Sequence, residues 1–203
     1  MATKKTAASK KAAAGTLAKL KTQRHAFKVD SHIVYPAHGV GKVIAIKQET
    51  IAGFDIESYI VEFLQDQMTL RVPTKKAKNL GMRKLANDNV LKDSFTTLKG
   101  RARIKRTMWS RRAKEYESKI NSGDLILLTE VVRDLHRTED QPDQSYSERQ
   151  LYERAIERLV REHAAIQKLD RGVAMEKILD TLTKARTRAS EKVEEKKGEE
   201  AAA

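Results

Sequence analysis

Hydrophobic and polar residues follow two different patterns along the chain, and one gives way to the other near residue 85. From residue 29 to 85, short runs rich in β-branched and aromatic residues are separated by glycine, proline and polar residues. Such runs are typical of strands joined by tight turns, so they predict a small antiparallel β-barrel. Gly39 and Gly41 are expected in one tight turn, and residues 52–55 at a hairpin tip. The runs are HIVYPAHGVGKVIAI (32–46), SYIVEFL (58–64) and MTLRVP (68–73).

Residues 86–188 show the spacing of amphipathic helices. Apolar residues recur three and four positions apart, as in Leu151, Ala155 and Leu159. The acidic residues alternate with Lys and Arg, which is typical of solvated helix faces. The pattern predicts a compact helical domain. The first two expected helices run from 88 to 98, with a stop at Gly100, and from 107 to 121, with Thr107 as N-cap. A third begins at 125 after a break at Ser122-Gly123-Asp124. A fourth begins at a Ser145/Glu148 capping box after a loop at 141–144, and a fifth runs from about 172 to 184.

Both ends of the chain are expected to be disordered. Residues 1–28 are rich in Lys, Ala and Thr and contain eight Lys or Arg side chains but no acid. Residues 189–203 are mainly Glu, Lys and Ala. Neither segment has enough apolar residues to build a core. The sequence therefore predicts a two-domain α+β protein with a basic, disordered N-terminal tail.

The composition points to an acidic polymer as the partner. The 203 residues carry a formal net charge of +13, and the isoelectric point is about 9.8. Such a charge suits nucleic acid or an anionic membrane surface. No apolar run approaches the roughly 18 residues that span a bilayer, and the N-terminus lacks the apolar stretch of a signal peptide. We therefore expect an intracellular, cytoplasmic protein.

The side chains that usually carry catalysis form no recognisable set. The chain has no cysteine, which excludes disulfides, thiol nucleophiles and thiolate zinc sites. Its five histidines are scattered and lack the spacing of metal ligands. The sequence therefore predicts a protein that is not an enzyme and uses no cofactor or metal.

One basic stretch, residues 99–114, contains the only tryptophan, Trp109. No carboxylate lies between Asp93 and Glu115, whereas a solvated face usually carries interspersed acids. At the start of a helix, free N–H groups favour phosphate, and the ring can rest against a base step or sugar. Trp109 is also the first of four apolar positions at helical spacing, which suits a core residue, and charge and pattern leave both interpretations open. The cations are Lys99, Arg101, Arg103, Lys105, Arg106, Arg111, Arg112 and Lys114.

Four separated blocks together resemble the CarD/CdnL family of bacterial transcription regulators. They are VYPAHGVGKV (34–43), LRVPTKKAKNLGMR (70–83), WSRRAKEYESKINSGD (109–124) and EVVRDL (130–135). The match is colinear from about residue 28 to 185, and four blocks in order are far more specific than any one of them. The first two blocks are also similar to the polymerase-binding module of the transcription-repair coupling factor, but this chain has no Walker motif.

The resemblance implies a Tudor-like, SH3-like module at 29–85 that binds the β subunit of RNA polymerase, and a helical DNA-binding domain at 86–188. Trp109 would wedge at the upstream edge of the promoter bubble and stabilise the open complex. We expect a monomer that associates with the nucleoid through RNA polymerase. The DNA-contacting residues implied by the resemblance and the basic stretch are Trp109, Arg111, Arg112, Lys114, Arg101, Arg103, Lys105 and Arg106. Those expected at the β subunit are Arg71, Val72, Pro73, Thr50 and Glu49, and Glu49 stands where the family has an arginine.

A second interpretation of the charge remains open. The Lys-rich tail could make the chain a general nucleic-acid-binding protein, either chromatin-like or RNA-binding, because phosphate contacts need no sequence specificity. Such binding would survive deletion of residues 30–85, whereas a factor anchored on polymerase would lose its effect on promoters.

Overall fold

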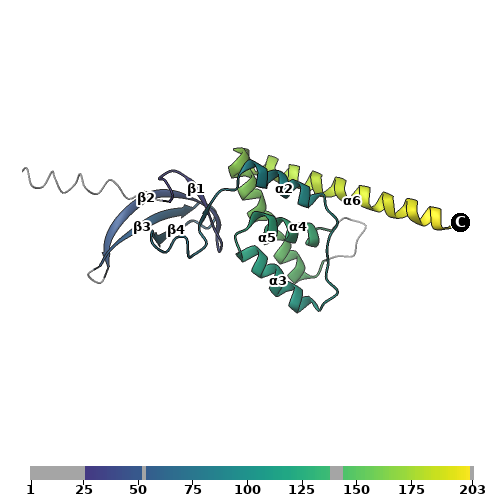
Figure 1. The fold of residues 1–203 in the computed structure, drawn as a ribbon, viewed down its shortest axis with the longest axis horizontal. Helices are drawn as coiled ribbons and strands as arrows, with labels where there is room; N and C mark the ends of the chain where they lie inside the picture. Colours follow the sequence, from purple (N-terminus) through teal and green to yellow (C-terminus); the bar gives the residue numbers. More distant parts are fainter. Residues whose placement is uncertain (1–25, 52–53, 138–143, 202–203) are drawn as a thin grey trace, which may run out of the picture.

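A computed structural model describes residues 26–51, 54–137 and 144–201 of the protein. A sheet of β1 to β5 comes first and a domain of α2 to α6 follows, so the expected α+β class is confirmed (Figure 1). The sheet and the helical domain lie side by side, and α6 extends away from the sheet (Figure 1).

The sheet is antiparallel and open. Its strands are β1 (His32–Tyr35), β2 (Gly39–Ile51), β3 (Phe54–Phe63), β4 (Met68–Pro73) and β5 (Arg83–Lys84), in the order β4-β3-β2-β1-β5. Within the described residues nothing pairs β4 with β5, so the sheet does not close and the expected small β-barrel is not confirmed. The physical reason is that β5 has only two residues, and both pair with β1. A bulge between Val43 and Ala45 interrupts the register of the long β2–β3 hairpin.

The inner face of the sheet forms the first core. Tyr59, Val61 and Phe63 of β3 are buried there, and Phe27 packs edge-on against Tyr59 with ring centroids 5.6 Å apart. The boundary expected at residue 28 is therefore too late, because Phe27 already belongs to the core. The rest of the expected tail, residues 1–25, lies outside the described residues, as do residues 52–53 of the expected hairpin tip.

The two glycines expected in one turn have different roles. Gly39 has a φ of +81° at the start of β2, as a tight turn requires. Gly41 lies within β2, where an added Cβ would come within 2.7 Å of Val61 and Phe63. Close packing of β2 on the Val61 and Phe63 side chains therefore explains the glycine at position 41, and the expectation that Gly41 serves the turn does not.

The helices begin and end largely where local signals place them. They are α2 (Asp88–Leu98), α3 (Trp109–Asn121), α4 (Leu125–Leu135), α5 (Tyr146–Gln167) and α6 (Arg171–Ala201). Asp124 caps α4 by accepting from the Ile126 N–H at 2.9 Å, and Ser145 with Glu148 forms the expected capping box of α5. The loop expected at 141–144 falls mostly outside the described residues.

Two helix boundaries differ from expectation. Thr107 is not the N-cap of α3; Met108 takes that position and makes no side-chain cap bond. The backbone of α6 remains helical to Ala201, so the helix passes the expected end at 184 and occupies the segment expected as a disordered tail. Ala, Glu and Lys have high helix propensity, which explains why a segment that cannot form a core can still continue a helix.

The helical core forms around α4. Its residues Leu128, Val131 and Val132 are buried in one cluster with apolar residues of α2, α3, α5 and α6. Two acids on these helices are also buried, Asp134 beside Arg133 and Glu162 beside Arg83. These two acids are exceptions to the expected solvated helix faces, because alternation in the sequence does not show which acids meet a cation in the interior.

Candidate nucleic-acid interface

Residues 99–108 form an irregular basic loop between α2 and α3. The buried carboxylate of Asp134 on α4 holds this loop, because its Oδ1 accepts from the Arg103 N–H at 2.9 Å. The same oxygen accepts from the Arg133 Nε at 2.9 Å, so a buried ion pair anchors the loop backbone. The side chains of the loop cations expected at DNA are exposed: Arg101, Arg103, Lys105 and Arg106.

Trp109 is the first residue of α3 and is half-buried. Its indole Nε1 donates to the Ser147 Oγ on α5 at 2.9 Å. The ring lies 6.5 Å from the Tyr116 ring, centroid to centroid, and the Arg112 guanidinium carbon lies 5.5 Å from the ring centroid. One side of the indole therefore packs on the helical core, as the core interpretation expects, while part of it remains in solvent. Contact of the solvent-exposed part with nucleic acid stays a prediction.

The cations of the basic stretch divide into free and engaged side chains. Arg112 is mostly covered, lies over Trp109 and is 3.9 Å from Glu148, whereas Arg111 and Lys114 on the same helix are exposed. Lys105 donates to Glu115 at 2.5 Å, and this bond holds the pKa of the Glu115 carboxylate below its usual value. Among the cations of the basic stretch, all of which the structure describes, those whose side chains have no ion pair are Lys99, Arg101, Arg103, Arg106, Arg111 and Lys114.

Two exposed apolar side chains that no sequence pattern marks occur beside Trp109. Met108 is 79% exposed and immediately precedes the ring. Tyr146 is 81% exposed and immediately precedes Ser147, the hydrogen-bond partner of the indole. Periodicity could not identify them, because both stand at helix starts and outside any apolar stripe. We call Met108, Trp109, Arg111 and Lys114, with the basic loop 99–108, the α3 surface.

The second set of expected contact residues lies on the sheet. Arg71 is on β4, an edge strand, and its side chain is 66% exposed. Its Nη1 lies 3.1 Å from the Glu49 carboxylate of β2, on the far side of β3. The structure therefore brings Arg71 and Glu49 together, which sequence separation conceals.

The other expected sheet residues contribute differently. The Val72 side chain belongs to the core and is 2% exposed, so only its backbone can meet a partner. Pro73 is half-buried at the end of β4. Thr50 donates to the Asp55 carboxylate at 2.7 Å near the hairpin end, away from the edge strand.

Comparison with known proteins identifies both halves of the chain. Residues 27–86 match the family model described as the CarD-like/TRCF RID domain, and residues 93–180 match the model described as the CarD C-terminal domain. The chain belongs to the CarD family. A relative in Bacillus subtilis (strain 168), the candidate transcription factor YdeB, is 28% identical over 141 residues, which cover 70% of this chain and 92% of YdeB.

CarD family membership indicates a role in the regulation of transcription. Among the described residues, no cluster of three or more His, Cys, Asp or Glu side chains is placed to hold a metal ion. None of the helices in the described part of the chain combines the length and apolar character needed to cross a membrane.

Proposed function

We propose that this protein binds the β subunit of RNA polymerase through its sheet domain, contacts promoter DNA at the upstream edge of the bubble through the α3 surface, and stabilises the open promoter complex. It acts as a monomer in the bacterial cytoplasm, associates with the nucleoid through polymerase, and uses no enzymatic step, cofactor or metal. The sheet domain, 29–85, acts as a Tudor-like module. The observation that carries the proposal is Trp109, a half-buried ring held on one side at the start of a helix and bordered by cations without ion pairs.

This geometry suits the edge of an opened duplex. The N-terminal N–H groups of α3 and the side chains of Arg111 and Lys114 attract phosphates. Trp109 and Met108 offer apolar surface to a base step that has lost its stacking partner. Such a step is exposed only in the open complex. A ligand shifts an equilibrium only by its differential affinity for the two states, so binding of this kind favours opening without any chemistry.

The contact with polymerase is supported by the edge strand. The outer side of β4 has no strand neighbour among the described residues, so its backbone is available to pair with a strand of a partner. Arg71 projects from this strand and can meet an acidic group on the partner, in competition with Glu49.

Replacement of Trp109 by Ala tests the proposal most directly. Loss of base stacking worth about 1–3 kcal/mol should shorten the open-complex lifetime roughly 5- to 150-fold, while binding to the β subunit stays within about twofold. Lifetime is measured by competitor challenge on purified polymerase and promoter DNA, and thermal unfolding is followed on the same variant.

Ser147→Ala is the matched control, because it removes the hydrogen bond to the indole and leaves the ring in place. It should change the lifetime much less than Trp109→Ala. A folded Trp109→Ala protein that still gives the normal lifetime would exclude the ring from the mechanism.

A further inference from the structure

The junction between the two domains is built from a few charged side chains that meet in the interior. Glu162 of α5 is 2% exposed. Its two carboxylate oxygens accept from the Arg83 Nη1 at 2.7 Å and the Arg83 Nη2 at 2.9 Å. Arg83 belongs to β5, so this bidentate ion pair joins the last strand of the sheet to α5 of the helical domain.

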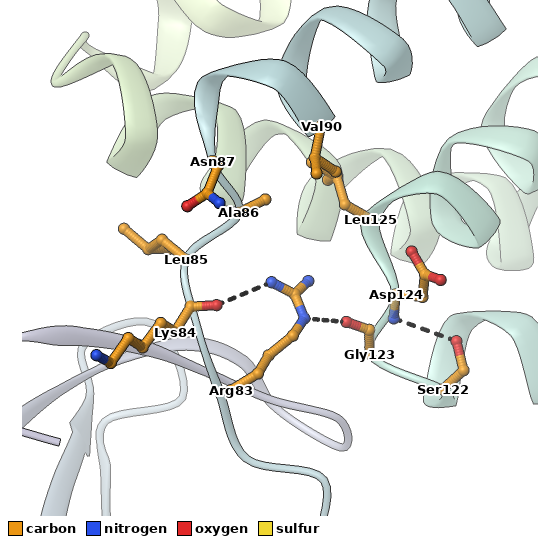
Figure 2. Close-up of a pocket in the computed structure, with 10 residues that line it drawn as sticks. All are labelled: Arg83, Lys84, Leu85, Ala86, Asn87, Val90, Ser122, Gly123, Asp124 and Leu125. Atoms are coloured by element: carbon orange, nitrogen blue, oxygen red, sulfur yellow. Dashed lines mark hydrogen bonds between the residues drawn. The ribbon is translucent and has the colours of Figure 1, made fainter. Parts of the chain in front are cut away.

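Arg83 and a second arginine of the junction, Arg158, also hold the C-terminal end of α3. The Arg83 Nε donates at 2.5 Å to the carbonyl of Gly123, two residues beyond α3 (Figure 2). The Arg158 Nη1 donates to the carbonyl of Ile120, in the last turn of α3, at 3.1 Å. It also donates to the carbonyl of Pro36, in the turn between β1 and β2, at 3.0 Å. One guanidinium therefore joins the end of α3 to the sheet domain.

A glycine brings the two domains into direct contact at Pro36. Gly123 has a positive φ, and a Cβ added to it would lie 3.2 Å from the Pro36 ring of the sheet domain. On the other side, Gly81 packs against the same ring from within the sheet domain, where an added Cβ would lie 2.8 Å from it. Beside this contact the packing is incomplete. A cavity of about 490 Å³ opens between the linker after Arg83 and the start of α4 (Figure 2), and one of about 310 Å³ opens between β2 and the α5–α6 turn.

Polar bonds of Arg83 and Arg158 therefore cross the junction and contribute to the placement of the two domains. Domains that share a small, polar interface normally move relative to one another. Here the buried carboxylate of Glu162 would lose its paired charge if Arg83 left, and the desolvation of an unpaired charge opposes that separation.

We propose that Arg83, Arg158 and Glu162 are positioning residues that fix α3 as a strut between the polymerase-bound sheet domain and the DNA. Trp109 lies at one end of α3 and the junction at the other, about 18 Å away along a 13-residue helix. Because α3 is fixed to the sheet domain, Trp109 stays at one place relative to bound polymerase. The conformational entropy of positioning Trp109 is therefore lost when the protein folds and not when it binds DNA. This inference rests on the proposed function.

The test combines a distance measurement with a promoter measurement on the full-length chain. The chain has no cysteine, so Lys78→Cys and Glu117→Cys at exposed positions of the two domains give unique spin-label sites. We compare the unmodified junction with the Arg158→Gln/Glu162→Gln variant. Glu130→Gln is the control, because it breaks the Lys119–Glu130 pair of 2.7 Å between α3 and α4 and leaves the junction alone.

We expect a narrow distance distribution for the unmodified and Glu130→Gln proteins and a broad one for the junction variant. The junction variant should bind the β subunit within about twofold of normal but shorten the open-complex lifetime about tenfold. Thermal unfolding is recorded in parallel, and if the double variant melts below the assay temperature, Arg158→Gln alone is used.

A narrow distribution in the junction variant would overturn the inference, because these bonds would then not set the placement. A broad distribution with a normal lifetime would overturn it as well, since positioning would be dispensable. If the unmodified protein itself fails to prolong the open complex, the proposed function fails and the positioning role falls with it, whereas the distance distributions still show whether the junction is locked.

Discussion

At the scale of single residues, His163 is a fully buried polar side chain with a structural role. Its Nε2 lies 3.0 Å from the Ser94 Oγ, a distance that also suits a nucleophile and its base. Both residues are buried, and Ser94 also lies 2.9 Å from the Thr129 hydroxyl. Because neither side chain reaches a surface where a substrate could approach, the pair joins α2, α4 and α5 rather than performing chemistry.

This burial predicts how stability depends on pH. Burial lowers the pKa of His163 from its ordinary 6.5 to about 4. Between those values the unfolded chain holds a proton that the folded chain does not, so the free energy of unfolding falls as pH decreases from 6.5 towards 4. His163 should contribute up to about 3 kcal/mol to that loss. Chemical denaturation of the unmodified and His163→Gln proteins at several pH values measures the difference, and parallel pH profiles for the two would contradict it.

Arg111 and Arg112 are neighbours in sequence but should differ in their effect on DNA binding. Arg111 is exposed, whereas Arg112 lies over Trp109 and near Glu148. Loss of one phosphate contact lowers the slope of log affinity against log salt by about 0.9. We expect Arg111→Gln to lower the salt slope of duplex-DNA binding by this amount, and Arg112→Gln to lower it by less. Equal reductions for the two variants would show that Arg112 also reaches phosphate.

At the scale of secondary structure, the sequence predicts the features that depend on neighbouring residues and misses those that depend on distant ones. The ends of α2, the Asp124 cap and the Ser145/Glu148 box depend on residues within one turn, and sequence identified all three. Closure of the sheet depends instead on whether a distant strand is long enough to pair, and two-residue β5 is not. The start of α3 was misplaced because Thr107 has the right chemistry for a cap but makes no such bond.

The edge strand β4 gives a prediction on the polymerase contact. Glu49 competes for the Arg71 guanidinium, and an exposed ion pair is worth about 0–1 kcal/mol. Glu49→Gln should therefore raise the affinity for the isolated β subunit by up to about fivefold, and Arg71→Gln should lower it. Titration by fluorescence anisotropy measures both. If Arg71→Gln leaves the affinity unchanged, the contact lies elsewhere on the sheet domain.

At the scale of the whole molecule, the candidate sites were partly predictable and their connection was not. Trp109 and its cations stand out because one stretch concentrates aromatic and positive side chains without acids. Arg158 and Glu162 lie four residues apart on α5 and look like ordinary members of its alternating charge, whereas Arg83 lies 79 residues before Glu162 in the sheet domain. Only the folded chain shows that they meet, because a buried ion pair between domains has no local sequence pattern.

The last prediction separates the proposed function from general nucleic-acid binding. Residues 1–25 carry seven Lys or Arg side chains and no acid, so their deletion removes seven charges from a net +13. If these charges serve only sequence-independent attraction, the deletion should weaken binding to random duplex DNA, most strongly at low salt. At saturating protein it should leave the open-complex lifetime within about twofold. Trp109→Ala should show the reverse, with random-duplex binding nearly intact and the lifetime shortened. Filter binding and competitor challenge on both proteins give the comparison. If deletion of the tail abolishes the promoter effect while Trp109→Ala preserves it, the chain acts through its basic tail as a general nucleic-acid-binding protein, and the α3 surface is not its working part.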